Sequence, residues 1–478
     1  MSTSVVMGVD VGSTETKALV LDRAGHRLAI DRRRTPWRRN RDGGADIEAD
    51  VLTDSVLSAI VNALRQAEAT VDAATVEGIA FTGMAESGVL LGGDGRPAAP
   101  VIAWFDPRGG EELAAWPVEL ADEFSGRTGL PLSPLCSAAK LLWLTGQGHD
   151  LSTASHWLSV PEYLAHFLGA PPAAEPSLLS RTGLLDQATG KPWTELLEAL
   201  GAPAGLLPES ADAGTPLGTV RADRAPDALR GAVVTVAGHD HPVASVGAHA
   251  ADDGHLFDSC GTSEALMRVI SEPLADDQRR RLTEAGLAQG MHLLPNRWIL
   301  LGGTRGGLML GRTLRMLGLD HAEGRARLDA DLAGSAQRPA HPPLRVHGAH
   351  AAATDIVLAL ASDDISPADV WDAALRHAMT ESEAVIAAME REVPAASSVT
   401  AAGGWTRMSS FRNAKATSLP ATRFADVDQP SAFGAAVIAE WATRGRTGEL
   451  AGLAAEFTHP DHHPSLTSAP TQKQELPA

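Results

Sequence analysis

Two short segments of the same design, far apart in the chain, constrain the possible fold more than any other feature. In residues 5–22, two apolar, β-branched runs flank a short polar turn, which is the pattern of a β-hairpin. Residues 255–267 repeat this pattern, with a strand, an aspartate, a Gly-Thr-Ser turn and a second strand. Two such hairpins, each at the start of a half, indicate an internal duplication whose halves could close on one ligand from opposite sides.

The turn of the first hairpin has the chemistry of an anion site. Gly12 lets the backbone turn its N–H groups outward, while Ser13 and Thr14 add hydroxyl donors. Lys17 supplies positive charge, and the set suits a polyphosphate. Asp10 would repel bare phosphate, so its position at the end of the first strand indicates a hydrated Mg²⁺ between the two. For this segment alone, the alternative is an ordinary hairpin with a polar turn.

The length and charge of the chain limit its class. At 478 residues it is too long for one ordinary core, so two domains of about 200 residues each are expected. With 40 basic and 59 acidic residues, the net charge of −19 argues against nucleic acid or an anionic membrane as the main partner. We interpret the basic run of residues 32–41 as a solvated loop or anion-lined surface rather than a nucleic-acid site.

The two cysteines, Cys136 and Cys260, lie far apart and without metal-ligand spacing. Neither a disulfide framework nor a structural zinc site is therefore expected. The N-terminus shows no export signal, and the chain has no uninterrupted apolar stretch of about 18 residues. These features predict a cytoplasmic protein without a membrane partner.

The segments after the first hairpin predict an α/β half. A third strand is expected over residues 26–33, a helix over 49–69 and a further strand over 76–82. This β-β-β-α-β order would place the hairpin at a sheet edge facing a cleft. Residues 113–217 predict helices joined by Pro-rich connections, an inserted helical subdomain without chemistry of its own; the helices are expected at 138–144, 160–168 and 194–200.

Residues 101–108 end an apolar run with an aromatic ring, an acid and a base. The ring of Trp104 could lie against the C–H groups of a polyhydroxylated ligand, while Asp106 accepts hydrogen bonds from its hydroxyls. The alternative is a buried Trp104 beside an Asp106–Arg108 surface pair.

The predicted strand at 232–237 leads directly into Gly238-His239-Asp240-His241. An acid at such a strand end is a candidate general base at the floor of a cleft, so we assign this role to Asp240. His239 and His241 could instead be metal ligands, although no third ligand is close in sequence. A helix N-cap at Asp240 is compatible with the base, because a cap position points the carboxylate outward.

The second half continues with strand, loop and helix signals. Residues 299–304 predict a strand and turn that contains Gly303, and residues 340–352 predict a loop. Ser366 is a strong helix start, because Pro367 occupies the first helical position and an acid follows in the first turn.

A short strand at 399–402 is followed by Gly403 and Gly404. Residues without side chains there would admit a flat ring close to the backbone, and a plain turn is the alternative. A last helix is expected over 432–443, and the segment from Thr447 onward is predicted to be irregular. Three histidines in that segment are interpreted as part of a polar tail rather than a metal site: His459, His462 and His463.

Taken in order, these motifs resemble those of the FGGY carbohydrate kinases, a branch of the actin/hexokinase/Hsp70 superfamily. Each motif is weak alone, but their succession from about residue 6 to residue 442 is specific. The resemblance implies an α/β fold of two ribonuclease H-like (actin-like ATPase) domains with an interdomain cleft. It places an N-terminal domain at 1–246, a C-terminal domain at 247–446 and a tail at 447–478.

The resemblance also implies the reaction and the roles of the residues. The expected activity is transfer of phosphate from ATP, with Mg²⁺, to a hydroxyl of a small sugar or polyol. Asp240 would be the catalytic base and Asp10 the metal ligand. The substrate would be held by Glu86, Trp104, Asp106 and His241. ATP would be bound by Gly12, Ser13, Thr14, Lys17, Gly261, Thr262, Ser263, Gly303, Gly403 and Gly404.

The sequence also departs from the family pattern. The segment 83–87 differs from the Q-M-H-G of xylulose kinases, although Glu86 falls where glycerol kinases have a substrate-binding glutamate. Trp405 follows the Gly pair where a small residue is commoner, and residues 342–352 lack the usual G-E-R-x-P-like segment. The substrate's identity and the oligomeric state stay open, with a homodimer as the working expectation. An actin- or Hsp70-like nucleotide switch is the alternative function, and a catalytically dead sensor is disfavoured by Asp10 and Asp240.

Overall fold

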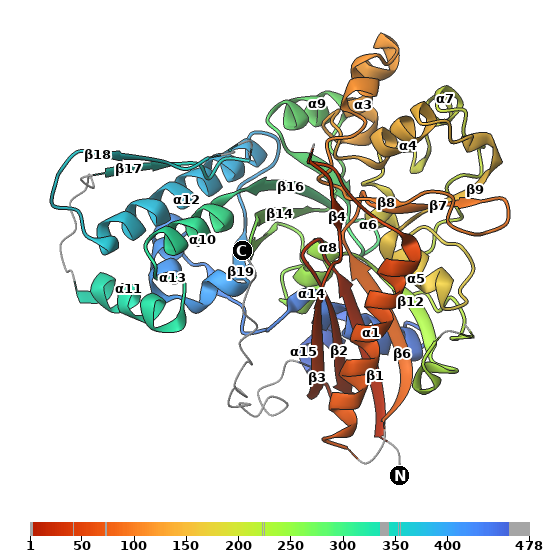
Figure 1. Ribbon diagram of the computed structural model, residues 1–478, viewed down its shortest axis with the longest axis horizontal. Helices are drawn as coiled ribbons and strands as arrows, with labels where there is room; N and C mark the ends of the chain where they lie inside the picture. The colour runs from red at the N-terminus through yellow and green to blue at the C-terminus, as the bar shows by residue number, and fades with distance from the viewer. Residues whose placement is uncertain are drawn as a thin grey trace.

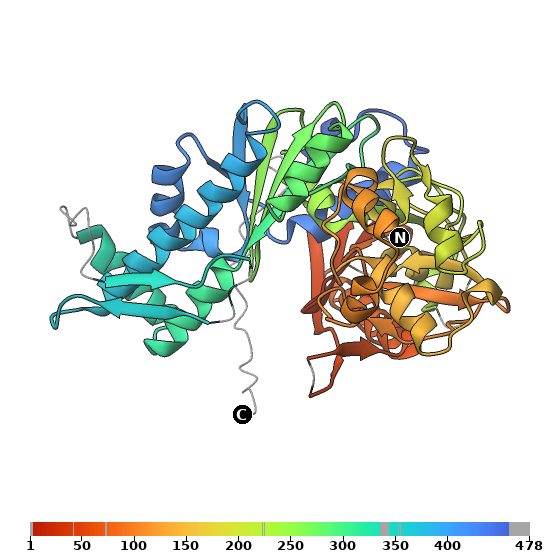
Figure 2. The ribbon, with the colours of Figure 1, turned by 90° about the horizontal axis from the view of Figure 1, so that it is seen from above.

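The computed structural model describes residues 3–457, except 42, 72–73, 222, 224, 335–343, 352 and 354. The chain forms two α/β halves that lie side by side, each built on its own mixed sheet (Figures 1 and 2). The expected α/β class and the two-domain arrangement are confirmed. Among the described residues, no helix combines the length and the apolar character that crossing a membrane requires.

The N-terminal sheet has the strand order β12-β6-β1-β2-β3. Its strands are β1 (Thr3–Val11), β2 (Glu15–Asp22), β3 (Arg27–Arg34), β6 (Ala74–Gly83) and β12 (Val233–His239). The first hairpin is confirmed, since β1 and β2 pair antiparallel while β6 and β12 run parallel to β1. The prediction that the hairpin lies at a sheet edge was wrong. β1 is central because the parallel strands β6 and β12 add to its free side, and only the turn protrudes beyond the strand ends.

Each face of this sheet is covered by a helix from a different part of the chain (Figure 1). Odd-numbered residues of β1, such as Val5 and Met7, pack with α1 (Ala49–Glu68). Even-numbered Val6 packs with α14 (Pro430–Thr443), as the period of two along a strand requires. The predicted helix at 432–443 therefore returns to the N-terminal sheet, where it contacts β1, β6 and β12.

The inserted region between β6 and β12 contains the predicted helices and also strands. A strand that the sequence did not indicate, β9 (Ala154–Ser159), pairs antiparallel with β7 (Gly88–Gly92). Its helices are α2 (Gly110–Ala114), α3 (Val118–Thr128), α4 (Ser137–Gly146), α5 (Val160–Phe167), α6 (Pro176–Leu179) and α7 (Thr194–Ala199). Its short strands are β8 (Val101–Ile102), β10 (Leu185–Asp186) and β11 (Lys191–Pro192); β8 joins β4 (Arg38–Arg39) and β5 (Ala45–Ile47) in a separate sheet.

The C-terminal sheet has the strand order β15-β16-β14-β13-β19-β20 and contains the second predicted hairpin. Its strands are β13 (His255–Cys260), β14 (Glu264–Ile270), β15 (Ala288–Met291), β16 (Trp298–Thr304), β19 (Ser398–Ala402) and β20 (Arg423–Phe424). The helices of this part are α8 (Asp240–Gly247), α9 (Asp276–Glu284), α10 (Gly306–Met316), α11 (Ala322–Gly334), α12 (Pro367–Met389) and α13 (Ser409–Ser418). Ser366 caps α12 by accepting from the backbone of Asp369, as predicted.

Two segments expected to be irregular contain regular structure. Within 340–352, residues 344–347 form β17 (Leu344–His347), which pairs with β18 (Val357–Leu360). Within the segment after Thr447, α15 (Leu450–Phe457) forms because its apolar side chains pack with those of α14. Residues 340–343, 352 and 458–478 lie outside the described residues, and so do His459, His462 and His463.

The two halves contact each other along β15. Gln187, in the loop after β10, donates to the carbonyl of Gln289 at 2.9 Å, and the Gln289 amide donates back at 2.7 Å. The Met291 N–H donates to the Ser180 hydroxyl at 2.9 Å. The segment that follows α6 is therefore fixed against the C-terminal sheet.

Candidate active site

Predicted site residues converge at the carboxyl ends of β1, β6 and β12. Asp10 on β1 lies opposite Thr82 on β6, and His239 on β12 lies opposite Gly83. Asp10 and Asp240 therefore leave the sheet at the same edge, on either side of β6. In open α/β sheets this is the edge at which ligands bind.

The first turn follows directly after Asp10. The N–H groups of Ser13 and Thr14 have no hydrogen-bond acceptor in the described part of the chain. The Lys17 ammonium lies 3.2 Å from Oδ2 of Asp10. Burial lowers the pKa of Lys17, but the charges of Asp10 and Glu15 more than offset this, so the net shift is upward and Lys17 is a cation.

Asp10 is nearly fully buried and only one of its oxygens is used. Lys17 contacts Oδ2, whereas Oδ1 is buried without a partner among the described residues. A buried carboxylate oxygen without a donor is costly unless a cation or water occupies the space beside it. Asp10 therefore fits the hard, oxygen-preferring Mg²⁺, directly or through water.

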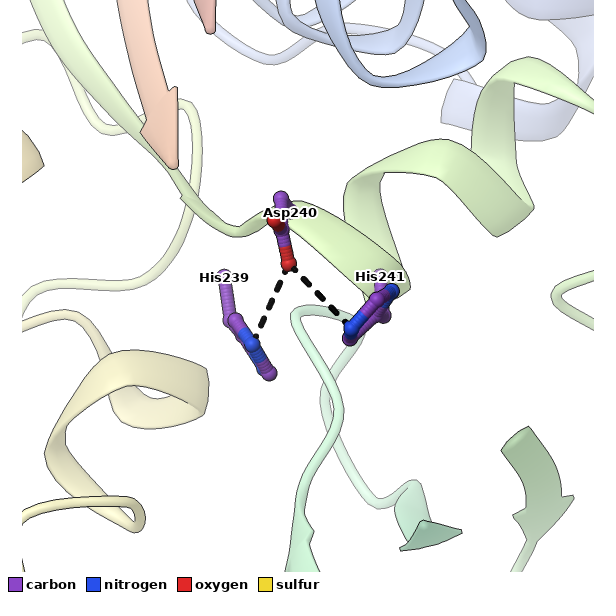
Figure 3. A group of neighbouring side chains, drawn as sticks. All are labelled: His239, Asp240 and His241. Carbon is purple, nitrogen blue, oxygen red and sulfur yellow. Dashed lines mark ion pairs between the residues drawn. The ribbon is translucent and has the colours of Figure 1, made fainter. Parts of the chain in front are cut away.

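Asp240 is the first residue of α8, and its carboxylate lies between two imidazoles (Figure 3). Oδ1 lies 3.2 Å from Nε2 of His239 and 3.8 Å from Nε2 of His241. The alternative of an N-cap at Asp240 is wrong by one residue, because the N-cap of α8 is His239. The ligand atoms of these three residues lie within 4.8 Å of one another, close enough for one metal ion to contact all three.

The electrostatics of this group favour a proton acceptor. Burial raises the pKa of the Asp240 carboxyl, and the negative charges of Asp10 and Glu86 raise it further, while His241 opposes the shift. Burial, together with His241 and Arg181, lowers the pKa of His239 well below its usual value, so this imidazole is neutral. A carboxylate with a raised pKa at a strand end is a candidate general base.

Glu86 is bound by a residue that the sequence did not indicate. Arg181, directly after α6, donates to Oε1 of Glu86 from Nε at 2.8 Å and lies 2.6 Å from it through Nη2. The remaining nitrogen, Nη1, is buried without a partner in the described ranges. Glu86 itself has a left-handed backbone with φ of 49°. The inserted region, for which no chemistry was expected, therefore supplies the charged partner of the predicted substrate residue Glu86.

The Asp106 carboxylate is fully buried and its oxygens are used within the protein. Its Oδ2 accepts from the backbone of Ala45 at 2.6 Å, and both oxygens accept from the guanidinium of Arg108. Burial raises the pKa of Asp106, but hydrogen bonds from Arg108 and Ala45 outweigh it and the net shift is downward. Lys140 on α4 donates to the Asp106 carbonyl. The Asp106–Arg108 pair of the alternative interpretation exists, but it is buried rather than on the surface.

Aromatic rings connect the predicted sugar side to the first turn. Trp104 contacts Phe105 edge-on at a centroid distance of 5.6 Å, and Phe105 contacts Trp37 at 6.0 Å. The Trp37 indole donates to the Ser13 carbonyl at 2.7 Å. Trp104 is partly buried, with part of its ring accessible.

A buried ionic network lies beneath the second turn, residues 261–263. The Lys415 ammonium, from α13, lies 2.8 Å from Asp258 and 2.7 Å from Glu264, the residues that flank the turn. Glu264 also accepts from Thr304 and Ser382. The turn itself is accessible at its tip, at Thr262 and Ser263.

The predicted glycines lie beside this turn. Gly403 has φ of 123° and packs against the Cys260 carbonyl, so a side chain there would collide with backbone. Gly404 is open, and Gly303 pairs with Ala265 across β16 and β14. Trp405 and Gly261 line the same small, mostly apolar recess. The structure therefore brings the second turn and the Gly403–Gly404 pair together.

Comparison with known proteins identifies the family. The model of the FGGY family of carbohydrate kinases, N-terminal domain, matches residues 5–247. The chain belongs to this family. It is 23% identical over 325 residues to a gluconokinase of Bacillus subtilis (strain 168), covering 66% of this chain and 60% of the relative. It is 28% identical over 282 residues to an L-fuculokinase of Salmonella typhi, covering 56% of this chain and 57% of the relative.

The FGGY fold extends over nearly the whole chain. A xylulose kinase structure from Brucella ovis (titled "xyloylose kinase") superposes with a TM-score of 0.81 at 22% identity, covering 94% of this chain and 92% of that one. By sequence, the chain spans about 60% of the length of the curated relatives that it matches first. The FGGY sequence signal therefore centres on the N-terminal half, while the fold likeness includes both halves.

Proposed function

We propose that this FGGY-family chain transfers the γ-phosphoryl group of ATP to a hydroxyl of a small sugar or polyol. The observation that carries the proposal is the placement of Asp240: a partly buried carboxylate with a raised pKa, on the same strand edge as Asp10 and the turn at residues 12–14. Phosphoryl transfer asks little covalent chemistry of a protein, so positioning and charge neutralisation dominate.

In this mechanism the carboxylate of Asp240, whose side chain is 24% exposed, accepts the proton of the attacking hydroxyl. Neutral His239, 3.2 Å from Oδ1, does not compete as a charged partner for the carboxylate. The free N–H groups of Ser13 and Thr14, with Lys17 beside them, bind phosphate oxygens. Bound Mg²⁺, held by Asp10, would neutralise phosphate charge.

The second turn and the Gly403–Gly404 pair would bind the other side of the nucleotide. Thr262 and Ser263 offer accessible hydroxyls, and Gly404 leaves open space for a flat ring. Because the two turns belong to different sheets, one nucleotide bound by both would fix the position of the two halves relative to each other. Excluding water from between them would protect ATP from hydrolysis.

The charges near Asp240 favour a neutral substrate over a sugar acid. Arg181 is already paired with Glu86, Lys17 with Asp10, and Arg108 with Asp106. Asp240 adds a further negative charge. Among the described residues, the ion-pairing groups within contact distance of its carboxylate are the imidazoles of His239 and His241. Arg181 Nη1 can still donate to one substrate hydroxyl while the free oxygen of Glu86 accepts from its neighbour.

The test is ATP-dependent phosphorylation across a panel of glycerol, tetritols, pentitols, ketoses and sugar acids. We expect a neutral compound to be turned over, and Asp240→Asn to lower turnover by about 10²- to 10⁴-fold while ATP still binds. Asp253→Asn, at an exposed carboxylate, is the matched control and should leave turnover unchanged. Near-normal turnover in Asp240→Asn would remove Asp240 from its role.

Other outcomes would redirect the proposal. Sugar-independent ATP hydrolysis, with no phosphorylated product, would favour the nucleotide switch. Preference for a sugar acid over every neutral compound would contradict the substrate class but not the kinase activity. Light scattering on the same preparation tests the predicted homodimer.

A further inference from the structure

We propose that Thr35 and Trp37 are positioning residues that hold the first phosphate-binding turn in the shape required for phosphoryl transfer. They lie between β3 and β4, in the basic segment that the sequence alone favoured as a solvated loop or anion-lined surface. The proposal rests on the kinase function above, because it assigns the way in which the turn at residues 12–14 is kept ready for ATP.

Three successive carbonyls of the turn are bound by this short segment. The Thr35 hydroxyl donates to the Gly12 carbonyl at 2.6 Å, and the Trp37 indole donates to the Ser13 carbonyl at 2.7 Å. The Thr35 N–H donates to the Thr14 carbonyl at 3.0 Å. All the carbonyls of the turn are therefore satisfied from one side.

Binding the carbonyls also orients the N–H groups. Peptide units are planar and trans, so the N–H of each unit points opposite to its carbonyl. Fixing the carbonyls of Gly12 and Ser13 toward Thr35 and Trp37 turns the N–H groups of Ser13 and Thr14 the other way. These two N–H groups have no acceptor among the described residues. Adjacent free N–H groups that point to one side form an anion-binding concavity.

The same segment reaches the substrate side through aromatic contacts. Trp37 packs edge-on against Phe105, and Phe105 packs edge-on against Trp104, with interplanar angles of 81° and 85°. The guanidinium of Arg39 lies over the Phe105 ring, 5.3 Å from its centroid. The Trp37 ring therefore supports the predicted sugar-binding ring, while its N–H supports the phosphate turn. This division lets the two contributions be separated by substitution.

Trp37→Phe removes the indole donor and keeps an aromatic ring against Phe105. We expect kcat/KM for ATP to fall about tenfold, the effect of one lost positioning hydrogen bond, with KM for the polyol unchanged. The dissociation constant of a non-hydrolysable ATP analogue should rise, whereas that of adenosine, which lacks phosphates, should not change. A general loss of folding would instead weaken the binding of the ATP analogue, of adenosine and of the polyol alike.

Thr35 offers an independent and reversible test. Thr35→Val is nearly isosteric and removes the hydroxyl donor, so it should lower kcat/KM for ATP by a similar factor. Thr35→Ser restores the donor and should recover most of the loss. Trp298→Phe is the matched control, because the Trp298 indole N–H has no partner in the described part of the chain and its end of β16 lies away from the turns.

The results separate this proposal from the kinase assignment. If the unaltered protein phosphorylates no polyol or sugar, the proposed function fails first. If it is active and Trp37→Phe and Thr35→Val keep its ATP parameters, or if Thr35→Ser is as impaired as Thr35→Val, the positioning role is overturned.

Discussion

Asp240 lies near two other carboxylates. Burial raises the pKa of the Asp240 carboxyl most, and the charges of Asp10 and Glu86 raise it further. Asp10 is compensated by Lys17 and Glu86 by Arg181, so the three acids can coexist at one strand edge. The proposed base therefore binds its proton more tightly than an exposed aspartate, which would help it to accept one from a hydroxyl.

The pH dependence of turnover follows from this environment. A protonated Asp240 cannot act as base, so kcat should rise with pH through the pKa of Asp240, above the ordinary aspartate value of about 3.9. Glu86→Gln removes a negative charge that raises this pKa, so the rising limb should move to lower pH. His241→Gln removes the opposing influence, so the limb should move to higher pH. Profiles of kcat at saturating polyol measure both, and shifts in the same direction would contradict the assignment.

Arg181 should contribute mainly to substrate binding. Arg181→Met removes the unpartnered donor Nη1 and frees Glu86, so we expect KM for the polyol to rise about tenfold with a smaller effect on KM for ATP. Arg230→Met, at an exposed arginine that pairs with the exposed Asp227, is the control. Steady-state kinetics with each substrate varied in turn provide the measurement. An unchanged polyol KM would exclude Arg181 from the substrate site.

Lys415 is the buried cation between Asp258 and Glu264, so we expect it to stabilise the second turn. Lys415→Met would leave Asp258 and Glu264 buried without their cation, which typically costs about 3–5 kcal/mol. Lys191→Met, at an exposed lysine of β11, should change stability by less than about 0.5 kcal/mol. Urea unfolding measures both. Equal stability of Lys415→Met and the unaltered protein would show that the network contributes little.

At the scale of elements, the contact of α14 with the N-terminal part depends on glycines. A side chain at Gly8 would collide with the backbone of α14, and one at Gly434 would collide with the Val243 carbonyl in α8. Gly247 likewise faces the Pro430 carbonyl. Because backbones approach directly at all three positions, α14 lies close against β1 and α8.

Gly434→Ala should therefore destabilise the protein, although alanine is the better helix former. Overpacking of this kind costs about 1–3 kcal/mol, which exceeds the gain of up to about 1 kcal/mol in helix propensity. Gly452→Ala in α15 meets nothing within 4 Å and should be neutral or stabilising. Thermal unfolding of the two variants should give shifts of opposite sign. A stabilised Gly434→Ala would mean that α14 can move away without cost.

At the scale of the whole molecule, the N-terminal half is completed by the other end of the chain. One face of its sheet, including Val6, Leu19 and Leu21, forms a single apolar cluster with α14 and α15. Phe457, at the end of α15, is fully buried there and packs against Gly25. The segment matched by the family model therefore lacks the two helices that cover this face of its sheet.

A fragment of residues 1–247 should consequently fail to fold cooperatively. It lacks α14 and α15, so the sheet face that they cover would be exposed, and burial of apolar surface is the main stabilising contribution to such a core. We expect strong binding of a hydrophobic dye and a broad thermal transition by circular dichroism. Co-expression with residues 248–457 should restore a sharp transition. A sharp transition in the fragment alone would contradict this dependence.

The sequence alone determined the elements whose signals are local. The two hairpins, the helix that begins after Ser366 and the strand that leads to Asp240 are set by neighbouring residues, through apolar periodicity, turn residues and caps. The order of motifs along the chain was enough for the family. These features depend on short-range preferences that packing did not override.

Tertiary structure alone decided the strand order and the partners of the site residues. Arg181, Lys415 and Trp37 bind Glu86, Asp258 and Ser13 from segments distant in sequence, and no local pattern marks them. Packing also decided that the Asp106 carboxylate is used inside the protein and that α14 returns to β1. A buried charge must find its counter-charge, and a buried carbonyl its donor, wherever the fold supplies one, so this information lies in contacts rather than in neighbouring residues.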